Sequence, residues 1–476
     1  QQDRLNYTSY SYNPLSALDS TGRGRTDGDY TWSNMGANLN YQHTFRAGRE
    51  ITADLDYIRY HSGGQQDLRN VTTLDDGLPG NSRQFFYGLP SNITIYTAKA
   101  DYQHALKKRA KLEAGFKSSV VTNDNQSDYY SVNETQYTPD YRRSNHFLYR
   151  ETIHAAYLNA RKDWKRVAVQ AGLRVENTQA QGQQLGNAIV TGSAFEKNYA
   201  GVFPMVQLRF KLDSTGENGL NLSLARRINR ANYYQLNPFL FYRDNYSYTS
   251  GNPDLNPQYN YIAEIKYQYD QLLNVGLRYG YFTDLIFSTV QVIDNVFITL
   301  PENIGQGKNI ALTTNVSFSP AKWWHLNTNL TYAHLALKGR IFTENLNSSV
   351  NVARINVLNQ FKSSNNWSGE LGGFYESRNL AGQTIIDPRY RINAAVQKEI
   401  FKRKGTLRLV IEDVFYSWRQ QDRTLSLRQA ESFHTNQMDT RRIGLAFSYR
   451  FGKESFARKR KYNDNAADEE KGRVGQ

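Results

Sequence analysis

The sequence predicts an all-β protein folded as a transmembrane antiparallel β-barrel, and three observations lead to this prediction. Apolar and polar residues alternate through most of the 476 positions, as they do in strands with one apolar and one polar face. No apolar run approaches the roughly 20 residues of a membrane-spanning helix, so a helical membrane protein is excluded. The mean hydropathy is low, at −0.69, but barrel strands average to low values because their two faces differ.

The alternation places about 18 strands of roughly 8 to 15 residues along the chain. Most of them form hairpins with short turns, several of which are basic. The hairpins pair 35–45 with 51–57, 93–106 with 111–122, 147–161 with 167–179, 203–212 with 220–227, 259–269 with 273–282, 310–318 with 326–337, 350–361 with 367–375 and 390–401 with 407–416. A leading strand at 5–12 and a closing strand at 441–451 complete the set.

The connections between predicted strands alternate in length. Short turns join the strands of each hairpin, and long segments rich in Asn, Asp, Gly and Tyr join the hairpins, the longest being 61–93 and 227–259. Short turns on one rim and long loops on the other are typical of bacterial outer-membrane barrels. Several of the 6 Trp residues lie at the short turns, where an interfacial aromatic girdle is expected. They are Trp164, Trp323, Trp324 and Trp367.

Strand length separates the barrel from its main alternative, a soluble β-sandwich. Sandwich strands favour about five to six residues, whereas a tilted membrane strand needs about 9 to 11. In the closing strand, every second residue from Ile443 to Phe451 is apolar or aromatic, and those between are mostly small or polar. A soluble sandwich with such long edges would invite aggregation, so we favour the barrel.

Three neighbouring motifs lie near the middle of the chain: an Ala-Arg-Arg-Ile-Asn-Arg stretch within 220–239, Gly-Asn-Pro-Asp-Leu-Asn-Pro within 250–257, and Tyr-Ile-Ala-Glu at 261–264. They resemble the barrel of TonB-dependent outer-membrane receptors, most closely the Bacteroidetes-type outer-membrane β-barrel branch. Ala231 stands where that family usually has Pro, and Gln258 where it usually has Glu. Both departures are small, and the resemblance extends over essentially the whole chain.

The resemblance implies a 22-stranded barrel with an N-terminal plug and a TonB-interacting stretch. We expect residues 1–452 to form the C-terminal barrel portion of such a protein, with the plug absent and a gap in the wall beside 441–451. A closed 18-strand barrel would instead indicate a porin-like channel. Residues 453–476 are basic and then acidic, without apolar periodicity, so we expect a polar periplasmic tail that is disordered or loosely bound.

The formal net charge of +14 indicates anionic partners. Basic residues gather at the turns 107–111, 162–166 and 402–404, where head groups of outer-membrane lipid and lipopolysaccharide would attract them; a solvated charge run is an equal alternative. These turns are spread around a ring, so nucleic acid is not an expected partner. Other expected partners are a surface lipoprotein or envelope complex, and TonB only through a missing N-terminal region.

The sequence offers no chemical centre. It contains no cysteine, and its 8 His residues are scattered without ligand spacing. No nucleophile-elbow, zinc-protease or Walker-type motif occurs. We therefore expect no enzyme, no metal site and no cofactor.

Ligand contact is predicted for the long loop 227–259, because Tyr and Arg are the usual hot-spot residues at interfaces. The candidate ligand-binding residues are Tyr233, Tyr234, Tyr242, Arg243, Tyr246 and Tyr248. The resemblance implies that a second set, which matches the family motif, contacts a plug inside the lumen: Arg226, Arg227 and Arg230. The closing strand also resembles the signal read by the barrel-assembly machinery, carried by Gly444, Phe447, Tyr449 and Phe451.

The leading functional hypothesis is TonB-dependent uptake, across the outer membrane of a Gram-negative cell, of a ligand too large for porins. The alternatives are a non-transporting scaffold or interaction barrel in an envelope assembly, and a porin-like channel. No pattern in the sequence identifies the ligand.

Overall fold

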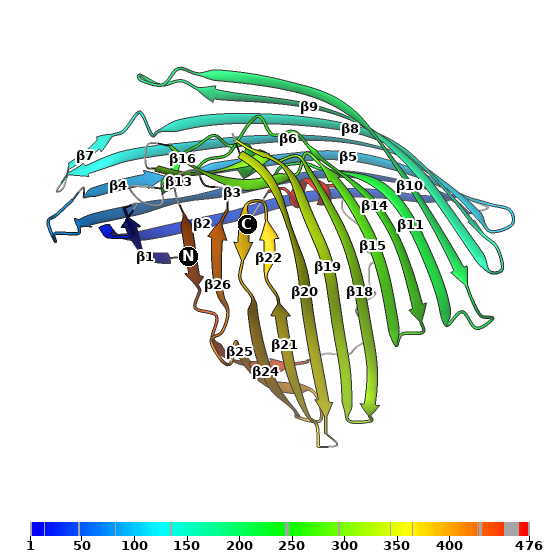
Figure 1. Ribbon diagram of the computed structural model, residues 1–476. Helices are drawn as coiled ribbons and strands as arrows, with labels where there is room; N and C mark the ends of the chain where they lie inside the picture. The colour runs from blue at the N-terminus through cyan, green and yellow to red at the C-terminus, as the bar shows by residue number, and fades with distance from the viewer. Residues whose placement is uncertain are drawn as a thin grey trace.

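The computed structural model describes residues 2–13, 15–45, 48–80, 82–133, 136–242, 247–293, 296–342, 344–363, 365–425, 427, 431–451 and 466–474. Strands that pair antiparallel with their neighbours form one continuous curved wall (Figure 1). In the first half of the chain its strands are β1 (Gln2–Tyr12), β2 (Leu18–Phe45), β3 (Arg49–Leu74), β5 (Ser91–Leu106), β6 (Ala110–Asn133), β8 (Asn145–Asp163), β9 (Val167–Leu185), β10 (Ser193–Lys211) and β11 (Asn218–Asn229).

The second half continues the wall in the same order. Its strands are β14 (Gln258–Tyr269), β15 (Leu273–Thr283), β18 (Gln306–Ala321), β19 (Trp324–Ile341), β20 (Glu344–Lys362), β21 (Trp367–Glu376), β24 (Arg389–Ile400), β25 (Gly405–Glu412) and β28 (Arg442–Tyr449). Every predicted hairpin is present, and so are the leading and closing strands. The predicted fold class is therefore confirmed.

The connections differ from the prediction in two ways. The long segments, predicted only as polar connections, carry short strands of their own, whereas the segment predicted between residues 337 and 350 is short, since β19 ends at Ile341 and β20 begins at Glu344. Two of these strands, β4 (Arg83–Gly88) and β7 (Gln136–Pro139), extend the wall. The others form two small four-stranded sheets: β12 (Phe241–Tyr242), β13 (Ser247–Thr249), β16 (Ile286–Ile293) and β17 (Val296–Asn303), and β22 (Asn379–Ala381), β23 (Thr384–Ile386), β26 (Arg419–Thr424) and β27 (Ser432–Gln437).

The wall is open among the described residues. β1 pairs with β2 and β28 pairs with β25, but no pairing joins β1 to β28. This is the predicted gap beside the closing strand, and it does not match the closed barrel that a porin-like channel would need. The total of 22 strands stays a prediction. No helix in the described ranges is long and apolar enough to cross a membrane.

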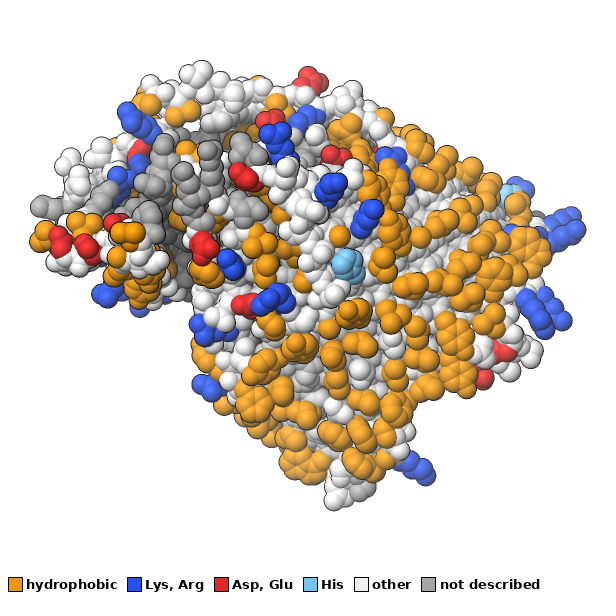
Figure 2. All heavy atoms as spheres, viewed as in Figure 1, with side chains coloured by type: hydrophobic (Ala, Val, Ile, Leu, Met, Phe, Trp, Pro, Cys, Tyr) orange, Lys and Arg blue, Asp and Glu red, His pale blue; other side chains and the backbone are white. Residues whose placement is uncertain are grey.

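The two faces of the wall have different chemistry. On β9, Leu173 and Val175 lie on the outer face and are 47% and 45% exposed, whereas Glu176 lies on the inner face and is buried. Figure 2 shows apolar side chains gathered over the outer surface of β10 to β21. Buried polar residues line the inner face of the first half: Asp54, Asp56, Lys117, Ser119, Asn123, Asn125, Glu151, Glu176 and Thr178. This is the polar interior and apolar exterior of a membrane barrel.

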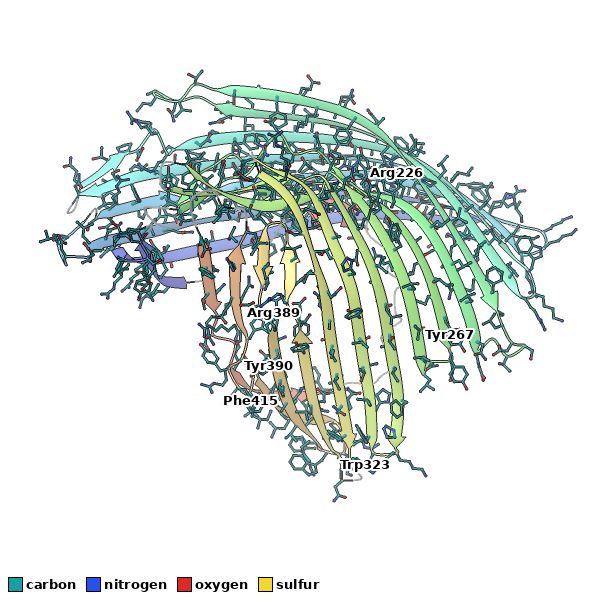
Figure 3. The ribbon with its side chains drawn as sticks, viewed as in Figure 1. Arg226, Tyr267, Trp323, Arg389, Tyr390 and Phe415 are labelled. Carbon is teal, nitrogen blue, oxygen red and sulfur yellow. The ribbon has the colours of Figure 1, made fainter. Side chains whose placement is uncertain are left out.

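The aromatic residues expected at the short turns lie there. Trp323 occupies the turn between β18 and β19 (Figure 3), and Trp324 and Phe361 stack near it. Trp164 lies under the Lys162 ammonium, 5.9 Å from the ring centre. Such a belt matches a position at the membrane interface, where the apolar part of each ring faces lipid and its polar part faces water.

Replacing Leu312 with Arg should destabilise the protein in a bilayer by about 2–4 kcal/mol, the cost of a cation on the lipid face near the midplane. Leu312 is 43% exposed on the outer face, opposite Leu277 and Tyr332. The measurement is the temperature at which the folded band disappears from a heat-modifiability gel.

The matched control is Thr313→Arg on the opposite face of the same strand. Arg278, paired with Ala311, already lies on that inner face. If Thr313→Arg lowers the temperature at which the folded band disappears as much as Leu312→Arg does, the assignment of the two faces is contradicted.

Candidate functional site

The long loop between β11 and β14 folds inward onto the wall. Its one-turn 3₁₀ helix η2 (Tyr233–Leu236) begins after Asn232, whose backbone N–H donates to the Gln235 side chain at 2.9 Å. A Cβ at Gly251 would lie 2.2 Å from the Asn237 carbonyl, so only Gly permits this close return of the chain. The loop's apolar residues are buried against strands β3, β5, β6 and β8 of the inner wall: Ala231, Tyr233, Leu236, Phe239 and Leu255.

This packing corrects the expected role of the first loop tyrosine. Tyr233, predicted to lie on a loop surface, is 1% exposed, with its ring 6.2 Å from that of Tyr149. Burial raises the pKa of the Tyr233 phenol above its usual range, so this group is neutral. Its neighbour Tyr234 is 59% exposed. Arg243 and Tyr246 lie outside the described residues.

Tyr242 and Tyr248 belong to a separate aromatic cluster near the long-loop rim. Their rings lie 5.5 Å apart, and Tyr242 also contacts Phe85 and Tyr129. The Arg143 guanidinium lies 4.9 Å from the centre of the Tyr242 ring. Sequence reasoning missed Phe85, Tyr129 and Arg143, because no local pattern joins residues so far apart along the chain.

The three arginines predicted to contact a plug have different surroundings. Arg226 donates to the Val202 carbonyl at 2.8 Å, and its guanidinium lies 4.7 Å from the centre of the Tyr259 ring. Figure 3 labels it on the wall. Arg227 is exposed. Arg230 is buried on the inner face, where it contacts a segment that lies against the wall.

That segment is the C-terminal stretch 466–474, drawn in red inside the curve of the wall in Figure 1. It contains the single-turn helix α1 (Asp468–Lys471). Ala467 is fully buried, and Glu470 and Arg473 are 1% and 8% exposed. The expectation of a disordered or loosely bound tail is therefore wrong for these residues. Apolar periodicity could not reveal the docking, because mainly charged side chains make the contacts.

The carboxylates of α1 meet cations from β6, from β9 and from the residue that follows β11. Lys117 of β6 donates to Glu470 at 2.9 Å and to Glu469 at 3.3 Å. The Arg230 guanidinium lies 3.4 Å from Glu469, and that of Arg174 lies 3.6 Å from it. Two adjacent carboxylates are thus held by three cations.

Arg473 is the most buried anchor of the segment. Its guanidinium forms a two-pronged ion pair with Glu151 of β8 and donates to the Ala231 carbonyl at 3.0 Å. The guanidinium also lies 4.4 Å from the centre of the Tyr233 ring. Burial is the largest single influence and would lower the pKa of Arg473, but the Glu151 carboxylate and the neighbouring tyrosines together outweigh burial and raise that pKa, so the side chain stays charged.

Docking of the segment 466–474 should weaken as the pH falls below about 4.5. Burial acts to raise the pKa of Glu469, but Lys117, Arg230 and Arg174 outweigh it and lower that pKa below the ordinary 4.5. A lowered folded-state pKa gives stabilisation that is present above the ordinary pKa and is lost as the pH falls through the lowered one. A spin label on Lys471→Cys, the only thiol in the chain, would become more mobile below pH 4.5.

The carboxylates Asp468, Glu470, Glu151 and Glu176 also lie on or against this segment, so the pH experiment needs variants that isolate Glu469. In Glu469→Gln, the acid-induced gain in label mobility should be lost. In Asp468→Asn it should persist, because that side chain is 55% exposed and its ion pair is with Lys471, the residue that the label replaces. If the label still becomes more mobile at low pH in Glu469→Gln, Glu469 is not the group whose protonation releases the segment.

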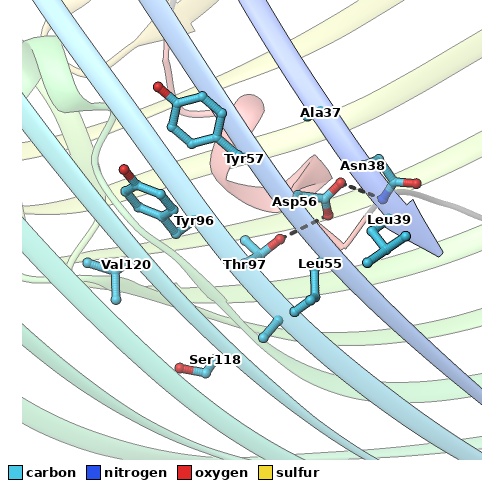
Figure 4. Close-up of a pocket in the computed structure, with 11 residues that line it drawn as sticks. Ala37, Asn38, Leu39, Leu55, Asp56, Tyr57, Tyr96, Thr97, Ser118 and Val120 are labelled. Atoms are coloured by element: carbon cyan, nitrogen blue, oxygen red, sulfur yellow. Dashed lines mark hydrogen bonds between the residues drawn. The ribbon is translucent and has the colours of Figure 1, made fainter. Parts of the chain in front are cut away.

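The wall also carries hollows among its described residues, one of which lies beside the segment. A cavity of about 590 Å³ lies beside Glu469 and is lined by Arg174, Arg226 and Tyr157 among others. Another hollow, a groove of about 550 Å³, crosses β2, β3, β5 and β6, and Figure 4 shows the residues that line it. In that groove Asp56 accepts bonds from Asn38 at 2.7 Å and Thr97 at 2.9 Å. No group of His, Asp and Glu residues in the described ranges is arranged to hold a metal ion.

Residues 43–449 match the outer membrane protein beta-barrel family. The fold is similar to the ferric yersiniabactin uptake receptor of Yersinia pestis, with 11% identity, coverage of 94% of this chain and 74% of the receptor, and a TM-score of 0.57. For the ferric-catecholate import receptor of E. coli K12, the identity is 10%, the coverages are 94% and 80%, and the TM-score is 0.54. For the ferripyoverdine receptor of Pseudomonas aeruginosa, the identity is 10%, the coverages are 94% of this chain and 69% of the receptor, and the TM-score is 0.53. No curated protein matches the sequence.

Proposed function

Because the chain belongs to the outer membrane protein beta-barrel family, we propose that it is the wall of a TonB-dependent receptor that takes up a ligand too large for porins. The family and the shared receptor fold place it in the outer membrane of a Gram-negative cell. The observation that carries the proposal is the inner face, where charged residues such as Lys117, Glu151 and Glu176 are buried on a wide wall. A lumen with fixed charges can select and guide a polar ligand.

In this proposal TonB acts through a region N-terminal to the barrel wall. Lipid and lipopolysaccharide contact the outer face and the basic turns, and a surface lipoprotein is a candidate partner at the long-loop rim. Ligand contact would use exposed Tyr234 on the inward loop and the partly exposed pair Tyr242 and Tyr248 near this rim.

One observation favours a second candidate, a non-transporting scaffold. Loop residues 231–239 and 255 and segment 466–474 both occupy the inner side of the wall. A barrel that only presents surfaces to partners would have no need for a clear path through its lumen.

Uptake measurements separate these candidates. Cells with and without the protein would be given a radiolabelled ferric catecholate, radiolabelled copper and a fluorescent maltooligosaccharide, each with and without a protonophore. The transport proposal expects at least one probe to enter only with the protein present and the membrane energised. Protein-dependent entry that ignores the protonophore would indicate a channel, and no dependence for any probe would favour the scaffold.

A further inference from the structure

We propose that the inner wall carries a binding site for a short peptide with two adjacent carboxylates followed three residues later by an arginine. Its ligand in this chain is the chain's own segment 466–474, held exchangeably, so that this segment closes part of the lumen from within.

Charge complementarity defines the peptide that fits. Three cations of the wall face Glu469 and Glu470, and one carboxylate of the wall, Glu151, faces Arg473. A peptide bound in the reverse direction would place its arginine beside the three cations, and it would place its two carboxylates beside Glu151. The site therefore selects both the sequence and the direction of its ligand.

The wall positions these charges without help from the segment. Arg230 is held by Glu176 at 2.6 Å and by the Thr178 hydroxyl at 2.9 Å. Arg174 pairs with the same Glu176. On the next strand Tyr149 donates to Glu151 at 3.0 Å. The groups that hold these charges lie on the long strands β8 and β9, and Arg230 directly follows β11, so the site stays formed when the segment leaves, as preorganised binding requires.

Apart from these ion pairs and the contacts of Arg473 with the inward loop, the segment has little other support. Its helix is a single turn of 4 residues, far shorter than the ~12–15 residues at which isolated helices become marginally stable. Its buried apolar side chains are small, with Ala467 fully buried and Val474 packed against the same cluster. Ion pairs with the inner wall supply most of the attachment, and buried ion pairs add little net stability because the cost of removing both charges from water offsets their attraction.

A single thiol can report release of the segment, because the chain has no cysteine of its own. In full-length Ala467→Cys, a membrane-impermeant maleimide should react slowly, since that position is fully buried. Adding Arg473→Glu places two carboxylates face to face, and labelling should become at least about tenfold faster. Adding Glu151→Arg to that variant should restore slow labelling. Leu15→Cys, at a position 88% exposed, controls for reagent reactivity.

A second measurement keeps the inference testable if the charge-reversed pair fails to fold. The synthetic peptide Ala-Ala-Asp-Glu-Glu-Lys-Gly-Arg-Val, which copies 466–474, is added to full-length Arg473→Glu carrying native Glu151, and a scrambled peptide serves as control. Selective binding of the native peptide supports the inference. Equal binding of both peptides, or an Ala467→Cys thiol that stays protected in Arg473→Glu, would overturn it. Neither readout requires uptake, so this result is separate from that of the transport proposal.

Discussion

Replacing Glu176 with Ala should lower the free energy of unfolding by about 3 kcal/mol, the low end of the cost of breaking a buried ion pair, because Arg230 keeps a longer contact with Glu469 at 3.4 Å. Glu176 is buried and holds two arginines, Arg230 at 2.6 Å and Arg174 on its own strand. The Arg230 side chain is 4% exposed and cannot turn to solvent without moving the inward loop that follows it. Urea unfolding followed by the loss of the folded gel band measures the change.

Glu370→Ala is the matched control for Glu176→Ala. Glu370 also pairs with an arginine across the wall, Arg408 at 2.6 Å, but their side chains are 31% and 38% exposed. Ion pairs of this kind contribute about 0–1 kcal/mol. If the two substitutions destabilise the protein equally, burial is not the reason for the effect, and the inner wall near Arg230 is more hydrated than its exposure indicates.

The wall could be predicted from sequence because its determinants are local. Alternation over a strand fixes which side chains face outward, and a short turn such as 107–109 fixes the partner of each strand. These two facts locate every hairpin from β2 to β25. The gap beside β28 followed from the resemblance, since periodicity alone does not say whether β1 and β28 meet.

The inner site could not be predicted for the opposite reason. Lys117, Glu151 and Arg230 come from separate parts of the chain. In the sequence, each looks like an ordinary polar residue in an alternating pattern. The segment that they bind is highly charged, and a charged stretch indicates disorder unless its partners are known. Arg230 was singled out through the family motif, but its contacts with Glu176 and Glu469 became visible only in three dimensions.

Tyr233→Ala is expected to release the inward loop from the wall. Removing a large buried aromatic side chain costs about 3–5 kcal/mol, and Tyr233 is 1% exposed between Tyr149 and the Arg473 guanidinium. The wall strands do not depend on this ring, so the loss should appear as local opening. The measurement is the rate of chymotrypsin cleavage within 231–257, compared with the unchanged melting of the folded gel band.

The neighbouring substitution Tyr234→Ala is the control, because that ring lies in the same turn but is 59% exposed; its effect should stay within about 0.5 kcal/mol. Tyr233→Ala should also speed labelling of Ala467→Cys, since the Tyr233 backbone N–H donates to the Arg473 carbonyl at 3.1 Å and its ring faces that guanidinium. Loop and C-terminal segment would then open together as one unit. Faster cleavage of the loop without faster labelling of the thiol would show that the two elements occupy the lumen independently.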